Sequence, residues 1–214
     1  MAKSPAQHIT FTSEDGFIIH GNLLRAGKKA VLLMHQFQLD KSSYSSFAQK
    51  LSDAGFTALA IDLRGHGESV LQNGKRRDFR TFSDKDFQDM LLDAKAAKEL
   101  LQKEGFELYA AVGSSIGANT ALMQASQDRE IQKIVLLSPG MDYFGIEITG
   151  AAKAVRAKTL IVASEEDSYS YTTSEALEGM IPNSELRALH NAGHGTGMFD
   201  GTNLQDELVK WLLG

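Results

Sequence analysis

Gly113-Ser114-Ser115-Ile116-Gly117 lies between an apolar run, residues 108–112, and a segment whose apolar residues recur at helical spacing. In the pattern G-x-S-x-G the two glycines allow a tight turn from a strand into a helix, and the serine hydroxyl projects past the strand beside N–H groups of the helix. The stretch therefore predicts a strand, a sharp turn and a helix, with Ser115 as a candidate nucleophile. Because so short a pattern can arise by chance, this interpretation depends on the other residues that such a serine requires.

Apolar runs of strand length alternate with segments of helical spacing along most of the chain. Strands are expected at residues 29–35, 56–61, 108–112, 131–137, 158–163 and 185–189, and helices at 41–54, 83–104, 116–125, 172–179 and 204–213. Two alternating runs at the front, residues 8–12 and 17–24, flank a glycine-containing turn and predict an antiparallel hairpin. The pattern is typical of the α/β class: one domain over residues 1–214, with a doubly wound, mostly parallel sheet, an N-terminal antiparallel hairpin and no large cap domain.

The composition is that of an ordinary globular protein and excludes several kinds of chemistry. The chain has 214 residues, a formal net charge of -5 and no cysteine. The absence of cysteine excludes disulfides, thiolate nucleophiles and cysteine-ligated metals. The acidic balance predicts neither a nucleic-acid partner nor binding to an anionic membrane, and no stretch has the length of a membrane span. We therefore expect a soluble, cytoplasmic protein.

A serine becomes an effective nucleophile when a base removes its proton and a carboxylate orients that base. Candidates for both follow later strands. Glu165, Glu166 and Asp167 come directly after the strand expected at 158–163, and His194 lies between two glycines after the strand expected at 185–189. The chain thus presents serine, acid and histidine in this order. The residues alone leave the choice among the three carboxylates open.

The other histidines have simpler interpretations. His8 and His20 lie in the predicted hairpin and are expected to be ordinary sheet or surface residues, and His66 lies in a glycine-rich loop, where a hydrogen bond to the backbone is expected. His190 is four residues before His194, which on a helix would place two metal ligands on one face. The residues between them, 191–193, indicate a loop, so no metal site is predicted.

With these residues in place, the chain resembles small members of the α/β-hydrolase superfamily, of the compact esterase and dienelactone-hydrolase-like kind. The resemblance extends from residue 17 to residue 213. It includes His35 at a strand end, residues 62–69, which are similar to the family pattern D-x-R-G-H-G-x-S, the turn at Ser115, and Gly193-His194-Gly195. It implies that Ser115 is the nucleophile, that His194 is the base and that Asp167 orients His194. It also implies that no metal or organic cofactor takes part.

The resemblance also implies an oxyanion hole, in which the backbone N–H groups of Phe37 and Ile116 would bind the oxygen that becomes charged. Two departures from the family pattern stand out. Gln36 occupies the position after His35 where the family commonly has glycine, so the geometry beside Phe37 is in question. Dienelactone hydrolases proper use a cysteine nucleophile, which this chain lacks, so that activity is disfavoured.

The expected function is hydrolysis of carboxylic esters with small or medium acyl groups, as in a carboxylesterase. The segment 138–157 is too short for a domain and would form a short lid or a pocket wall, in which Met141, Tyr143 and Phe144 are expected to line the acyl pocket. Hydrolysis of thioesters or amides by the same residues is an alternative. A non-catalytic ligand-binding or interaction protein with this fold is an alternative of another class, although such proteins usually lack one member of the set.

Overall fold

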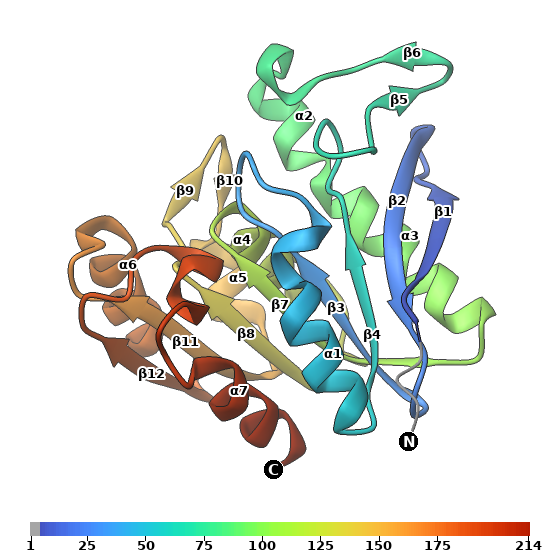
Figure 1. The fold of residues 1–214 in the computed structure, drawn as a ribbon. Coiled ribbons are helices and arrows are strands. Elements are labelled where there is room, and N and C mark those ends of the chain that lie inside the picture. Colours follow the sequence, from blue (N-terminus) through green and yellow to red (C-terminus); the bar gives the residue numbers. More distant parts are fainter. Residues whose placement is uncertain (1–4) are drawn as a thin grey trace.

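The computed structural model describes residues 5–214, and its centre is a twisted, mostly parallel sheet (Figure 1). The order of the sheet is β12-β11-β8-β7-β3-β4-β2-β5-β6, and β1 pairs with β2. The strands from β12 to β4 are parallel, whereas β2 runs antiparallel to β1, β4 and β5. The bounds are β1 Gln7–Thr12, β2 Phe17–Leu24, β3 Lys29–Met34, β4 Thr57–Ile61, β5 Leu71–Gln72, β6 Lys75–Arg76, β7 Glu107–Ser114, β8 Lys133–Leu137, β11 Lys158–Ser164 and β12 Ser184–Leu189.

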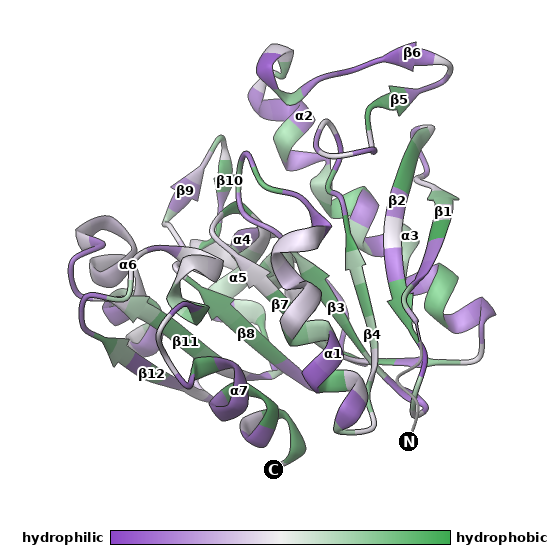
Figure 2. Cartoon of the chain, viewed as in Figure 1, coloured by the Kyte–Doolittle hydropathy of each residue, from purple (hydrophilic) through white to green (hydrophobic). Residues whose placement is uncertain are grey.

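Helices cover both faces of the sheet, which is why the central strands are apolar on both sides. On β3, Val31 and Leu33 pack in the core under α1 (Ser45–Asp53) and α7 (Leu204–Leu213). Leu32 and Met34 point to the other face. That face is covered by α3 (Met90–Lys103), α4 (Ile116–Gln127), α5 (Thr149–Ala154) and α6 (Ser168–Met180). Figure 2 shows the result as hydrophobic central strands between helices that are polar on their outer sides.

The predicted α/β architecture is confirmed; the differences concern short elements and the start of α6, which begins at Ser168 and not at residue 172. The helix expected at 83–104 is two helices, α2 (Asp84–Gln88) and α3, because the chain leaves the helix path at Asp89. The polar stretch after residue 63 contains β5, β6 and a 3-10 helix (Phe79–Thr81), and β5 extends the sheet beside β2. Strands of two residues show no alternation of apolar side chains, so periodicity cannot reveal them.

The segment between β8 and β11, for which a short lid or pocket wall was expected, has some structure of its own. It forms a small antiparallel pair, β9 (Asp142–Tyr143) and β10 (Ile146–Glu147), followed by α5. Figure 1 shows this pair beside the ends of the parallel strands. Within residues 5–214, no helix has the length and apolar character needed to cross a bilayer.

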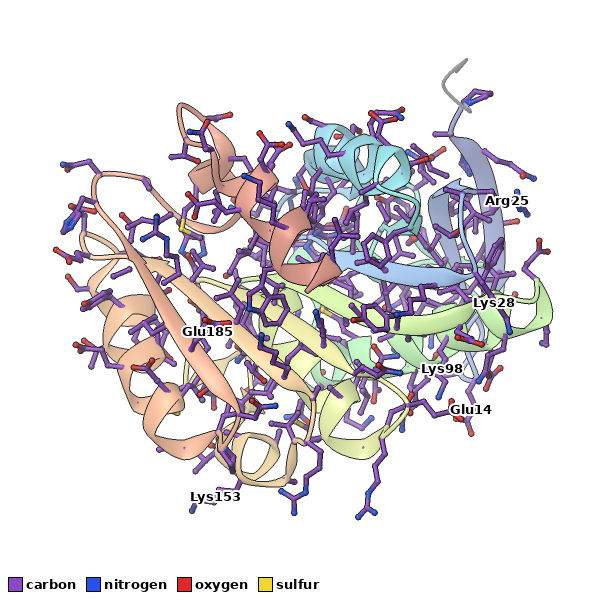
Figure 3. All side chains as sticks on the ribbon, turned by 90° about the horizontal axis from the view of Figure 1, so that it is seen from below. Glu14, Arg25, Lys28, Lys98, Lys153 and Glu185 are labelled. Carbon is purple, nitrogen blue, oxygen red and sulfur yellow. The ribbon has the colours of Figure 1, made fainter. Side chains whose placement is uncertain are left out.

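The opposite end of the molecule, where β3 and β7 begin, carries charged side chains (Figure 3). Arg25 pairs with Glu104 at 2.5 Å, and Lys28 pairs with Glu107 at 2.8 Å. These pairs are largely exposed, so each contributes little to the free energy of unfolding. The polar groups with catalytic potential gather at the other end, where the parallel strands finish.

A buried ion pair supports the loop that follows β4. The Arg64 side chain is 1% exposed and donates two hydrogen bonds, at 3.0 and 2.8 Å, to Oδ1 of Asp93, which is fully buried. The Arg64 N–H donates to Oδ2 of the same carboxylate at 2.9 Å. Asp15, which is more exposed, binds the other side of the guanidinium.

Replacing Asp93 with alanine is expected to lower the free energy of unfolding by about 3 to 5 kcal/mol, because the buried Arg64 guanidinium loses its main partner. Urea unfolding measures this change. Asp15→Ala is the matched control and should cost less, since water can replace its half-exposed carboxylate. If both substitutions lowered the free energy of unfolding equally, Asp93 would not be the main partner of Arg64.

Candidate active site

Ser115 lies at a sharp turn between β7 and α4. Its backbone angles are φ 54° and ψ −118°, a strained conformation for a residue with a side chain. Both flanking glycines are required by close packing. A Cβ on Gly113 would lie 2.0 Å from the carbonyl oxygen of Gly117, and a Cβ on Gly117 would lie 2.3 Å from that of Met34. The Ser115 N–H donates to the carbonyl of Leu137 at 2.8 Å, which fixes the turn against β8.

His194 contacts Asp167, although the two residues come from different loops. Asp167 follows β11, His194 follows β12, and His194 Nδ1 lies 2.6 Å from Asp167 Oδ2. The carboxylate favours a proton on Nδ1, so the neutral ring keeps Nε2 as the nitrogen that can accept a proton. The His194 side chain is 37% exposed, which leaves it accessible to a substrate.

The three neighbouring carboxylates have different partners. Glu165 pairs with His190 Nδ1 at 2.9 Å. Glu166 accepts hydrogen bonds from the Ser164 hydroxyl at 2.6 Å and from the Asn191 N–H at 2.7 Å. Of the three, Asp167 is therefore the one that contacts His194. His190 and His194, the pair considered as metal ligands, bind different carboxylates.

Hydrogen bonds connect the His194 loop to the strand that carries the serine. The Gly195 N–H donates to Ser138 Oγ at 2.9 Å, directly after β8. The Thr196 N–H donates to Gln36 Oε1 at 2.9 Å, and the Ser114 hydroxyl donates to the same oxygen at 2.9 Å. The loop with His194 is thus held next to the residue that precedes Ser115.

His35, at the end of β3, holds the loop that contains Phe37. The Leu63 N–H donates to His35 Nε2 at 3.0 Å, so the proton of the neutral ring is on Nδ1, which donates to the Gln36 carbonyl at 2.8 Å. Burial, together with the nearby His66, lowers the pKa of His35 to about 4. Within residues 5–214, the N–H groups of Phe37 and Ile116 donate to no other group, so both are free to bind an oxyanion.

This lowered pKa predicts a pH-dependent stability. The folded protein binds the His35 proton more weakly than the unfolded chain, whose histidines titrate near 6.5, so the free energy of unfolding falls as the pH drops from about 6.5 to about 4. The difference between the two pKa values corresponds to about 3 kcal/mol. Urea unfolding at several pH values should show a smaller fall for His35→Gln than for the unaltered protein. Parallel curves would contradict this prediction.

The motif at residues 62–69 has a structural role around His35. Asp62 is fully buried and accepts hydrogen bonds from the Lys41 N–H and from the Glu68 N–H. His66 Nδ1 bonds the Arg64 carbonyl at 3.0 Å, the kind of backbone contact expected for it. Burial lowers the pKa of His66, and its ring stacks on Phe79. These contacts hold the loop that receives the His35 side chain.

The three residues expected to line an acyl pocket lie in different surroundings. The Tyr143 hydroxyl lies 3.1 Å from Ser170 Oγ. Burial raises the pKa of Tyr143, and hydrogen bonding to the Ser170 and Ser115 hydroxyls opposes this rise. The ring centroids of Phe144 and Phe37 are 4.8 Å apart, and Phe144 remains 41% exposed. Met141 packs against the core. None of the three lines the neighbouring cavity of about 320 Å³, whose walls are Gln88, Leu91, Thr120, Met123, Gly145, Ile146 and Glu147.

Three side chains that no sequence pattern connects lie close together at the N-terminal hairpin. His8, His20 and Glu68 bring possible ligand atoms within 4.8 Å of one another. The Lys41 ammonium lies 2.6 Å from the Glu68 carboxylate, however, and its positive charge opposes a cation there. No sequence pattern predicts this group, because its members are up to 60 positions apart in the chain.

Comparisons with known proteins agree with the fold. Residues 25–159, more than half of the chain, match the family model described as serine aminopeptidase, S33. An esterase of Pyrococcus furiosus superposes with a TM-score of 0.79 at 18% sequence identity, over 98% of this chain and 91% of that one. A dienelactone hydrolase of Anabaena variabilis gives a TM-score of 0.75 at 19% identity, over 96% of this chain and 94% of that one.

A thermophilic esterase of Thermogutta terrifontis gives a TM-score of 0.77 at 18% identity, over 97% of this chain and 98% of that one. No curated protein sequence matches the chain. At such low identity the structural likeness concerns the fold, and the family rests on the matched model. The chain is a hydrolase with the α/β-hydrolase fold and belongs to the serine aminopeptidase S33 family.

Proposed function

We propose that the protein is a serine hydrolase that cleaves carboxylic esters through Ser115, His194 and Asp167. The observation that supports this most strongly is the 2.6 Å contact between His194 and Asp167, made by a loop that is hydrogen-bonded beside the strained turn of Ser115. A base with an oriented ring, in a loop packed against the residue before a serine at such a turn, supplies the parts that acyl transfer requires.

In the proposed reaction His194 Nε2 takes the proton of the Ser115 hydroxyl while Oγ attacks the ester carbonyl. The carbonyl oxygen becomes an oxyanion and accepts hydrogen bonds from the N–H groups of Phe37 and Ile116. The Asp167 carboxylate stabilises the protonated His194 ring. His194 then gives its proton to the departing alcohol, which leaves an acyl ester on Ser115. Water, deprotonated by His194, attacks this ester; the bond to Ser115 Oγ breaks, His194 returns the proton to Oγ, and the acid is released.

The surroundings of Ser115 support small or medium acyl groups. The segment between β8 and β11 consists of the short β9-β10 pair and α5, which is too little chain for a large cap. The exposed Phe144 ring beside Phe37 offers an apolar surface close to the proposed oxyanion hole. An acyl chain of a few carbons would pack against these two rings and lose part of its contact with water.

Replacing Phe144 with alanine is expected to lower kcat/KM for hexanoate esters about tenfold more than for acetate esters, because the longer chain loses apolar contact. Kinetics on p-nitrophenyl esters of two to eight acyl carbons measures this profile. Leu213→Ala, which also removes an exposed apolar side chain but at the end of α7, is the control and should leave the profile unchanged. The same ratio in both variants would refute a role for Phe144 in the acyl site.

The function is tested with matched panels of esters, thioesters and amino-acid anilides, together with labelling by a fluorophosphonate probe. We expect labelling and preferential turnover of short esters. Faster turnover of anilides would favour the amide chemistry that the family description names. If the probe labels no residue and the protein turns over no member of the panels, the proposal is overturned in favour of a non-catalytic protein of this fold.

A further inference from the structure

Gln36 follows His35 at the end of β3, and its side chain makes contacts that a glycine could not make. Gln36 is half-buried, and its Oε1 accepts three hydrogen bonds. The donors are the Ser114 hydroxyl at 2.9 Å, the Thr196 N–H at 2.9 Å and the Thr196 hydroxyl at 3.2 Å. One oxygen therefore connects the end of β3, the end of β7 and the loop after β12.

The orientation of the Gln36 amide follows from these donors. If the amide were rotated by 180°, its NH2 group would face the Thr196 N–H, which is a donor only. A hydrogen bond would be lost and two donors would oppose each other. The oxygen at this place is thus required by the backbone of Thr196, and the useful property of Gln36 is an acceptor at the end of a side chain of this length.

The position of Gln36 links residues next to the nucleophile, the base and one oxyanion donor of the proposed reaction centre. Ser114 precedes the nucleophile, Thr196 is two residues beyond the base, and Phe37, a proposed oxyanion donor, follows Gln36 in the chain. The Gln36 carbonyl also accepts the His35 Nδ1–H at 2.8 Å, which fixes the peptide group that carries the Phe37 N–H. The backbone and the side chain of one residue are therefore held at the same time.

The fit around Gln36 leaves the His194 loop little freedom. Gly195 has a φ of 60°, and a Cβ at this position would lie 2.1 Å from Gln36 Oε1 and 2.2 Å from Ser114 Oγ. The loop backbone thus packs directly on the Gln36 amide, and a glycine beside the base is needed for this contact.

We propose that Gln36 is a positioning residue, whose side-chain oxygen holds the loop of His194 in a fixed place relative to Ser115 and Phe37. It touches no reacting atom and acts through Thr196 and Ser114. The inference rests on the proposed function for its catalytic consequence, whereas the fixing of the loop can be measured without turnover.

The test compares Gln36→Met with Gln36→Glu. Methionine has a similar length but no oxygen, so Thr196 and Ser114 lose their acceptor. A displacement of the base by about 1 Å is sufficient for a loss of about 100-fold, so we expect kcat of Gln36→Met for p-nitrophenyl butyrate to fall by about 30- to 100-fold with KM changed less than about threefold. Glutamate keeps an oxygen in the same place and can accept all three hydrogen bonds, so kcat should stay within about fivefold of the unaltered protein.

Hydrogen exchange gives a second readout that needs no activity. The Thr196 amide hydrogen should exchange at least about tenfold faster in Gln36→Met, and its exchange rate should not change in Gln36→Glu. The Val162 amide inside β11 is the internal control, whose exchange rate should be the same in all variants. Thr196→Val, which keeps the N–H and loses only the longer of its two bonds to Gln36, should change kcat less than about threefold. Thermal unfolding of each variant verifies that it folds.

Three results would overturn the proposal: Gln36→Met with undiminished kcat, Gln36→Glu as impaired as Gln36→Met, or unchanged exchange of the Thr196 amide in Gln36→Met. If the unaltered protein hydrolyses none of the substrate panels, the proposed function fails on its own. The exchange comparison still decides in that case whether Gln36 holds the loop.

Discussion

Ser115→Ala is expected to lower kcat for p-nitrophenyl butyrate by about 10⁶-fold, because the alanine has no oxygen to attack the ester and no acyl-enzyme can form. The fold should persist, since the strained turn depends on the backbone of residues 113–117 and alanine fits the same space. We therefore expect a melting temperature within a few degrees of the unaltered protein. Steady-state kinetics and thermal unfolding provide the two measurements.

Ser126→Ala is the matched control for this substitution. Ser126 lies on α4, the helix that follows the nucleophile, and its hydroxyl bonds only the Met123 carbonyl within residues 5–214. Its removal should leave kcat within about twofold. A Ser115→Ala protein that turns over the ester at the unaltered rate would show that another residue carries the reaction.

The second large effect is expected for Asp167→Asn, with a loss in kcat of about 10⁴-fold. The asparagine is nearly isosteric, but it carries no charge to stabilise the protonated His194 ring. Its NH2 group can also face Nδ1 and select the wrong tautomer. KM should change little, because Asp167 lies behind His194 and has no contact with the substrate in the proposed reaction.

The neighbouring carboxylates supply the control for Asp167. Glu166→Gln removes the charge one residue earlier, where the carboxylate holds Ser164 and Asn191, and Glu165→Gln removes the partner of His190. Each should lower kcat by less than about tenfold. A larger loss in Glu166→Gln than in Asp167→Asn would transfer the orienting role to Glu166.

Much of the architecture follows from the sequence because the central strands are buried on both faces. Runs such as residues 30–34 and 160–163 are continuously apolar, and the bounds of α7 agree with its apolar spacing. The short strands β5, β6, β9 and β10 were not predicted, since two residues carry no period. The break at Asp89 was also missed, because the apolar stripe continues from α2 into α3.

The candidate site was predictable where a local pattern carries the information. Two glycines around Ser115 and two around His194 indicate turns at strand ends. Three consecutive carboxylates do not reveal which one meets His194, since this depends on how the chain turns after β11. The bonds of Gln36 to Ser114 and Thr196 join residues 78 and 160 positions apart, which no single-sequence pattern can show. The catalytic roles stay predictions that the variants above test.

The central claim is that Ser115 forms the covalent intermediate with the help of His194. The most direct measurement is peptide mass mapping of the protein after reaction with a fluorophosphonate, repeated on His194→Ala. We expect one modified residue, Ser115, in the unaltered protein and labelling at least about 100-fold slower in His194→Ala. Modification of a different residue, or equally fast labelling of Ser115 without His194, would contradict this account.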